Sequence, residues 1–196
     1  LLGIAGQARK LIVVDLDDTL WGGIVGDDGW EDLRLGGHDP IGEALVDFQA
    51  GLKALKNRGT LLGIVSKNEE SIAVEAISSH PEMVLRLEDF AGWRINWNDK
   101  ADNIVDLVLD LKLGLQSVVF IDDSPAERSR VSAALPEVLV PEWPTDQLLY
   151  KKALFGLACF DTPVITKEDL GRADFHAAER KRALIRDDLE TRDEWL

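Results

Sequence analysis

The sequence is poor in cysteine, in long apolar runs and in positive charge. Its single cysteine, Cys159, excludes an internal disulfide and a zinc site built from several thiolates, and it predicts a reducing, cytoplasmic setting. The longest apolar runs, LIVV at 11–14 and SVVFI at 117–121, fall far short of the roughly 18 residues of a membrane span. The N-terminal LLGIAGQAR lacks the basic region and the long apolar stretch of a signal peptide. No membrane association is therefore predicted.

Basic residues are outnumbered, because 22 Lys and Arg stand against 36 Asp and Glu, which gives a formal net charge of −14. Such a surface repels phosphate backbones, so nucleic-acid binding is disfavoured. Acidity of this kind most often serves solubility. A divalent-cation site is the sharper interpretation, and it requires carboxylates at particular places in the fold.

What the sequence does contain is an alternation of short apolar runs with longer amphipathic segments. Continuous apolar runs are typical of strands buried on both faces of a parallel sheet, and they lie at 11–14, 61–65 and 117–121, with weaker ones at 83–85 and 138–140. Helical periodicity follows at 41–57, 69–79, 99–113 and 126–135. The alternation predicts a Rossmann-like, three-layer α/β fold with a mainly parallel sheet.

Two segments break the alternation. The glycine-rich segment 21–35 carries Asp28-Gly29 between β-prone residues, which predicts a small β-hairpin flap. The highly charged C-terminal segment has helical propensity, so we expect a catalytic domain over 1–160 and a charged helical extension over 161–196. The spacing between the motifs described below leaves no room for a large cap domain.

Polar side chains follow the three strongest predicted strands, and a lysine begins a predicted helix. The set consists of Asp15, Asp17, Ser66, Lys100, Asp122 and Asp123. Ligands bind outside the carboxyl ends of parallel strands, so these side chains are expected to converge. Each residue alone is an ordinary capping, turn or surface residue. Their joint occurrence, in order, favours carboxylates that hold Mg²⁺ and, through it, a phosphate.

The string DLDDT at 15–19, followed by Ser66, Lys100 and the DD pair at 122–123, resembles the four motifs of the haloacid dehalogenase (HAD) superfamily. The resemblance implies aspartyl-phosphate chemistry with Mg²⁺. Asp15 would be the nucleophile, Asp17 the general acid/base, and Ser66 and Lys100 the phosphate clamp. The metal ligands would be Asp15, Asp122 and the backbone carbonyl of Asp17, with Asp123 supporting the site. These roles are physically coherent, because a carboxylate attacks an anionic phosphate only when the charges are screened.

Further candidates for substrate binding lie beside these motifs, namely Thr19, Trp21, Gly22, Gly23, Lys67, Asn68 and Arg94. The flap glycines could help to close the site, or they could be ordinary turn residues. Arg94 could grip a second phosphate or a carboxylate of the substrate. The alternative is a surface loop around Arg94 in which Trp97 packs on the core.

Longer strings narrow the resemblance, because VVDLDDTLWGGIVGDDG (13–29), SKN (66–68), WRINWNDK (93–100) and FIDDSPAER (120–128) are similar to the FkbH-like branch (subfamily IIIC). That branch implies a domain that takes a small phosphorylated acyl unit, with glyceryl from 1,3-bisphosphoglycerate as the expected unit. The acyl group is loaded with dephosphorylation onto a phosphopantetheinylated acyl carrier protein, in polyketide-type biosynthesis.

One position departs from that branch. Acyl-loading members often carry a cysteine directly before the motif serine, whereas this sequence has Val65 before Ser66. Three alternatives stay open: direct transfer to the carrier thiol, a different acyl unit, or a stand-alone magnesium-dependent small-molecule phosphatase. A non-catalytic interaction domain is a further rival, which the intact motif set disfavours.

Overall fold

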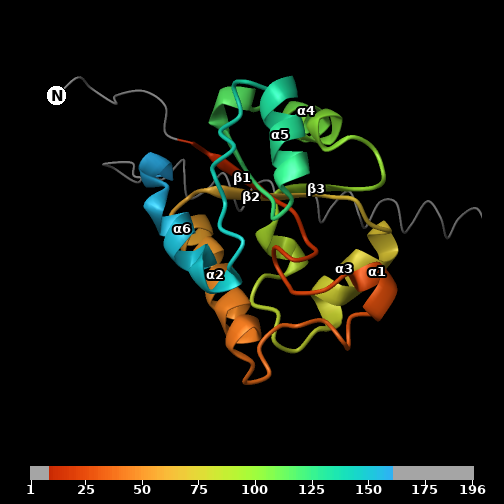
Figure 1. Cartoon of the computed structure of the whole chain (residues 1–196). Coiled ribbons are helices and arrows are strands. Elements are labelled where there is room, and N and C mark those ends of the chain that lie inside the picture. Colours follow the sequence, from red (N-terminus) through yellow and green to blue (C-terminus); the bar gives the residue numbers. More distant parts are fainter. Residues whose placement is uncertain (1–8, 161–196) are drawn as a thin grey trace, which may run out of the picture.

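One parallel sheet organises the part of the chain that the computed structural model describes, residues 9–160. Its four strands run in the order β3-β2-β1-β4, and they are β1 (Leu11–Val14), β2 (Leu61–Ser66), β3 (Gly92–Ile95) and β4 (Val118–Ile121). All three strand pairs are parallel (Figure 1). The predicted Rossmann-like α/β architecture is thereby confirmed.

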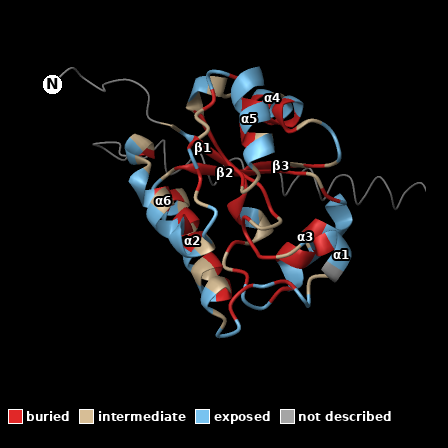
Figure 2. Cartoon of the chain, viewed as in Figure 1, coloured by how far each residue is buried: buried red, intermediate tan, exposed pale blue. Residues whose placement is uncertain are grey.

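Helices cover both faces of the sheet, so its strands are buried throughout (Figure 2). Ile12 and Val14 pack in one apolar cluster with the buried faces of α2 (Pro40–Asn57), α3 (Glu70–Ser79) and α6 (Tyr150–Gly156). Leu11 and Val13 point to the other face and pack with α4 (Lys100–Asp110) and α5 (Pro125–Ala134). The two-residue alternation of a strand thus feeds two separate cores, which explains the continuously apolar runs.

Helix starts are set by side-chain caps that the sequence supplies. Asp39 accepts a hydrogen bond of 2.8 Å from the Gly42 backbone N–H at the start of α2. Asp99 accepts one of 2.8 Å from Ala101 N–H, so that α4 begins at Lys100. Each cap satisfies a backbone donor that a helix N-terminus leaves free. For α4 the cap also fixes the position of the lysine that matters most below.

The three strong strands and the four helices are found where the periodicity predicts them, but the weaker strands differ. Residues 83–85 form no strand, and 138–140 contribute only a bridge from Leu139 to Val119. The fourth strand is β3, whose sequence GWRI is not a continuous apolar run. The short helices α1 (Val25–Asp28) and α6 were also not predicted.

The flap segment 21–35 is not a β-hairpin turning at Asp28-Gly29. Its centre is α1, and Gly29 ends that helix with φ +76°, a conformation that glycine adopts readily. A single antiparallel bridge joins Gly22 to Arg34, with backbone hydrogen bonds of 3.0 and 2.8 Å. The local β-propensity of this segment does not decide its structure, because a residue outside the segment stabilises the start of α1. There the Val25 N–H donates to the Asp17 carboxylate at 3.1 Å.

Within residues 9–160 no segment forms a separate cap domain over the carboxyl ends of the strands. None of the helices in that range is long and apolar enough to cross a bilayer. The predicted extension over 161–196 lies outside the described residues.

Candidate active site

The carboxyl ends of β1 and β4 set two aspartates side by side. Val14 pairs with Ile121 in the parallel register, and the next backbone N–H, that of Asp15, donates to Ile121 C=O at 3.0 Å. Asp15 and Asp122 therefore leave the sheet together, both buried. The sheet, rather than a loop, fixes their separation.

Lys100 reaches this pair from the N-terminus of α4. Its Nζ lies 2.9 Å from Asp15 Oδ2 and 2.6 Å from Asp122 Oδ2, and the residue is only 3% exposed. Burial alone would lower the lysine pKa, but the two carboxylates outweigh it and the pKa is raised. Lys100 is therefore a permanent cation between two buried acids.

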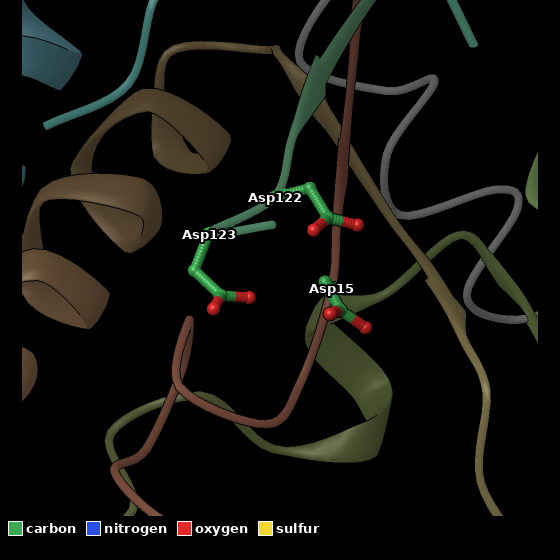
Figure 3. A group of neighbouring side chains, drawn as sticks. All are labelled: Asp15, Asp122 and Asp123. Carbon is green, nitrogen blue, oxygen red and sulfur yellow. The ribbon is translucent and has the colours of Figure 1, made fainter. Parts of the chain in front are cut away.

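Three carboxylates gather at one point. Asp15, Asp122 and Asp123 each offer an oxygen within 4.8 Å of the others (Figure 3). The second oxygen of Asp15, Oδ1, is buried and has no hydrogen-bond partner among the described residues. Since Mg²⁺ prefers hard oxygen ligands, this unsatisfied oxygen and its acidic neighbours fit that ion.

The charge state of the cluster reflects its burial. Desolvation raises the pKa of Asp122 to about 6, with repulsion from Asp15 adding and Lys100 opposing. Burial also raises the pKa of Asp123, helped by the charges of Asp15 and Asp18. Carboxylates crowded in this way gain from a divalent cation that neutralises them.

Asp17 is turned away from the cluster toward the flap. Its Oδ1 accepts from the Trp21 indole N–H at 2.9 Å and from Val25 N–H, and its Oδ2 accepts from the Asn68 amide at 2.9 Å. Burial raises the pKa of Asp17, these three hydrogen bonds lower it, and the net direction is upward. A raised pKa suits a carboxyl group that must carry a proton. Its carboxylate is not one of the three clustered groups, in keeping with a predicted ligand role for its backbone carbonyl alone.

Ser66, Lys67 and Asn68 follow β2 at the same edge. Asn68 Nδ2 lies 3.4 Å from the buried Ser66 Oγ as well as donating to Asp17. Lys67 Nζ makes an ion pair of 2.6 Å with Glu127, in the first turn of α5. Of the two predicted clamp residues, Lys100 contacts Asp15 directly, whereas Ser66 ends β2, the strand next to β1, and its hydroxyl lies near the Asn68 amide.

Several predicted substrate-binding residues instead support the site from within the protein. Thr19 is fully buried, and its hydroxyl accepts from Asp123 N–H at 3.2 Å. Trp21 is buried and holds Asp17, while Gly22 bridges to Arg34. The Gly23 N–H donates to the Asp18 carboxylate at 2.9 Å. None of these four residues is among those that line the pocket.

Arg94 is also not at the site. Its guanidinium forms an ion pair with Asp110 and donates to the Asp106 carbonyl, near the end of α4 that lies opposite Lys100. The two ends of this helix are roughly 15 Å apart at 1.5 Å per residue. β3 directs the Arg94 side chain onto α4, so the structure does not bring it to the clustered carboxylates.

A pocket of about 570 Å³ opens above the cluster. Asp15, Asp17 and Asp123 line it, with Lys67 and Asn68 beside them.

Sequence reasoning missed the outer lining of the pocket. The apolar residues there are Ile24, Ile72 and Trp97, and the acidic ones are Asp18, Asp27 and Glu69. Trp97 is 71% exposed, so it does not pack on the core. No periodicity marks these residues, and only proximity to the motifs could have suggested them.

Neither a protein-family model nor a curated protein matches this chain. Among solved structures, it is similar to the N-terminal part of the protein BF1531 from Bacteroides fragilis, which contains a phosphatase domain and was crystallised in complex with Mg. The two share 45% sequence identity with a TM-score of 0.79, over 82% of this chain and 43% of the other. This chain thus spans less than half of the length of that one.

Proposed function

We propose that this chain, which has the Rossmann-like fold of the haloacid dehalogenase superfamily, is a magnesium-dependent phosphatase domain of that superfamily with Asp15 as its nucleophile. One observation carries the proposal: the buried Asp15 has one oxygen on Lys100 and the other without a partner, at the floor of an open pocket. The likeness to a domain that was crystallised with Mg supports it.

Asp15, Asp122 and Asp123 would hold the ion, together with the Asp17 backbone carbonyl that the motif resemblance implies. When bound, Mg²⁺ would screen the repulsion between the Asp15 carboxylate and an anionic phosphoryl group. The Lys100 ammonium, which lies on the Asp15 and Asp122 carboxylates, would contribute a second positive charge.

The reaction divides into two steps on the chain's own residues. In the first, an Asp15 oxygen bonds to phosphorus while the bond to the leaving oxygen breaks, and Asp17 gives that oxygen its proton. In the second, Asp17 takes a proton from water, whose oxygen bonds to phosphorus and frees Asp15 and inorganic phosphate. Asp17 lines the pocket and has a raised pKa, which supports its role as the acid of the first step.

The finer proposal concerns the substrate, a small phosphorylated acyl unit that is loaded onto a phosphopantetheinylated carrier protein, as the FkbH-like strings imply. The open pocket supports it, because no cap within residues 9–160 blocks a long arm. Acyl transfer would go straight to the carrier thiol, with the acyl–oxygen bond replaced by a thioester and phosphate released.

Two positions in the chain argue against a cysteine relay. Val65 carries no thiol, and the backbone carbonyl of Cys159 accepts from Arg9 N–H, before the first residue of β1. Asp15 follows the other end of that strand, roughly 20 Å away at 3.3 Å per residue. The only thiol of the chain therefore lies at the opposite edge of the sheet.

The test is Mg²⁺-dependent phosphate release from small phosphate esters and acyl phosphates, with and without Asp15→Asn. We expect release that stops on chelation and a phosphoryl group on Asp15 that mass spectrometry detects after rapid quenching. Release that survives Asp15→Asn would overturn the proposal. A second reaction with 1,3-bisphosphoglycerate and the carrier separates the finer alternatives: a carrier mass gain supports loading, whereas phosphate release with unchanged carrier mass supports the stand-alone phosphatase.

A further inference from the structure

The pocket has a charged floor and a chemically different mouth. At the mouth lie three exposed apolar side chains, Ile24 from the flap, Ile72 from α3 and Trp97 from the loop before α4. They come from three separate segments, yet they line one opening. The indole of Trp97 is largely in contact with water, and packing it against an apolar or flat ligand would be favourable because it buries that apolar surface.

The charges at the mouth are acidic. Asp27 and Glu69 are exposed and line the pocket. Lys67 is the one cation among the described lining residues, and Glu127 already neutralises it at 2.6 Å. Lys100 lies beneath the floor, between Asp15 and Asp122. At the floor, Lys100 and the proposed Mg²⁺ would offset the charge of a phosphoryl group, whereas a second anion farther out meets the carboxylates of Asp27 and Glu69.

From this division we infer that the pocket selects phosphorylated substrates whose body beyond the phosphoryl group is uncharged and flat or apolar, with Trp97 packing on that body. The inference rests on the proposed function, since it concerns the same pocket. It makes Trp97 a specificity residue. It also makes a substrate with a second phosphate or a carboxylate at its far end the poorer one, and so favours a different acyl unit, without a second anion, over 1,3-bisphosphoglycerate.

Binding of two matched phosphonates tests the inference without turnover. The probes are 4-carbamoylbenzylphosphonate and 4-carboxybenzylphosphonate, which share a shape and differ in the charge at the far end. Titration calorimetry on the full chain with Mg²⁺ should give about fivefold tighter binding of the neutral probe, as expected for exposed like charges. The double variant Asp27→Asn/Glu69→Gln should reduce that difference to about twofold or less.

Trp97→Ala should weaken both phosphonates by about threefold to tenfold, the range of an aromatic contact, and leave inorganic phosphate binding unchanged. Leu109→Ala is the matched control, because Leu109 is 67% exposed on α4 and does not line the pocket. It should change none of the three affinities.

Equal affinity for the two phosphonates would overturn the inference, as would an absence of phosphonate binding. An equal effect of Trp97→Ala on phosphonates and on inorganic phosphate would assign Trp97 a merely structural role and would also overturn it. The proposed function fails separately, through phosphate release that Asp15→Asn does not stop. The two failures are therefore distinguishable.

Discussion

The Asn68 side-chain amide donates a 2.9 Å hydrogen bond to Asp17 Oδ2, and it ties the end of β2 to the residue proposed as general acid. Asn68 is buried, and its amide also lies 3.4 Å from Ser66 Oγ. Asn68 is not in the cluster of Asp15, Asp122 and Asp123 that could hold a metal ion, and its contact with the site is the hydrogen bond to Asp17. We therefore expect Asn68, which also lines the pocket, to act as a positioning residue for Asp17.

Asn68→Ala should lower kcat by about tenfold while KM for a small phosphate ester changes little. The variant removes the hydrogen bond that orients Asp17, and that orientation matters for protonating the leaving oxygen rather than for binding the substrate. Steady-state kinetics measures the split. A KM effect equal to the kcat effect would instead assign Asn68 to substrate binding.

Lys100→Met removes the cation between two buried carboxylates. The metal-free variant should lose about 3–5 kcal/mol of unfolding free energy, the typical effect of breaking a buried ion pair. Mg²⁺ should then raise the variant's Tm by more than it raises that of the wild type, since the ion supplies the missing charge, while phosphate release stays lost. Thermal scans with and without Mg²⁺ check this, and equal shifts in the two proteins would contradict it.

Magnesium should stabilise the native chain. At an ion concentration about 100 times the Kd, the expected gain in unfolding free energy is about 2.7 kcal/mol. Asp123→Asn should reduce the gain because it removes one of the clustered carboxylates. Asp47→Asn, an exposed carboxylate that pairs with Lys151 outside the cluster, should leave the gain unchanged.

Asp39 should make stability depend on acid. Its hydrogen bonds with Arg34 and Gly42 N–H lower the pKa of its carboxyl from 3.8 to about 2. A depressed folded-state pKa gives stability that is present above the unfolded value and is lost as pH falls toward about 2. The Tm difference between wild type and Asp39→Asn should therefore be full at about pH 5 and shrink below about pH 4. A difference that stays constant over this range would refute the assignment.

Gly42 and Gly156 provide a matched pair of helix substitutions. A Cβ on Gly42 would overlap the carbonyl oxygen of Gly36, so Gly42→Ala should destabilise the chain by about 1–3 kcal/mol. A Cβ on Gly156 meets nothing within 4 Å, so Gly156→Ala should be neutral or stabilising by up to about 1 kcal/mol. Chemical denaturation measures both, and a similar loss in the two variants would contradict the packing argument.

The strands that carry the site could be predicted because each is apolar on both faces. In β1, β2 and β4 the continuous apolar runs leave little choice but a doubly covered sheet, and the polar residues that follow must then meet at one edge. β3 could not be predicted in this way. It lies at the edge of the sheet, and its Arg94 turns outward to α4, which breaks the apolar pattern.

The flap and the pocket mouth depend on contacts between segments far apart in sequence. The conformation of residues 21–35 depends on the hydrogen bonds that Asp17 accepts from Val25 and Trp21, so local β-propensity predicts the wrong element. Trp97 is of a residue type that usually packs in a core, and only the tertiary structure shows that it is exposed. The roles of individual site residues remain predictions for the experiments above.

The parallel register of β1 against β4 has a practical consequence for refolding work. Because Val14 faces Ile121, Asp15, the proposed nucleophile, and Asp122 meet only when these two strands are aligned, and a one-residue slip would turn one of them to the opposite face. A chain with misaligned strands would thus be catalytically inactive even if it were compact and helical. The catalytic activity per molecule would then report the fraction of a preparation in which β1 and β4 have the native register. Circular dichroism alone would overestimate that fraction.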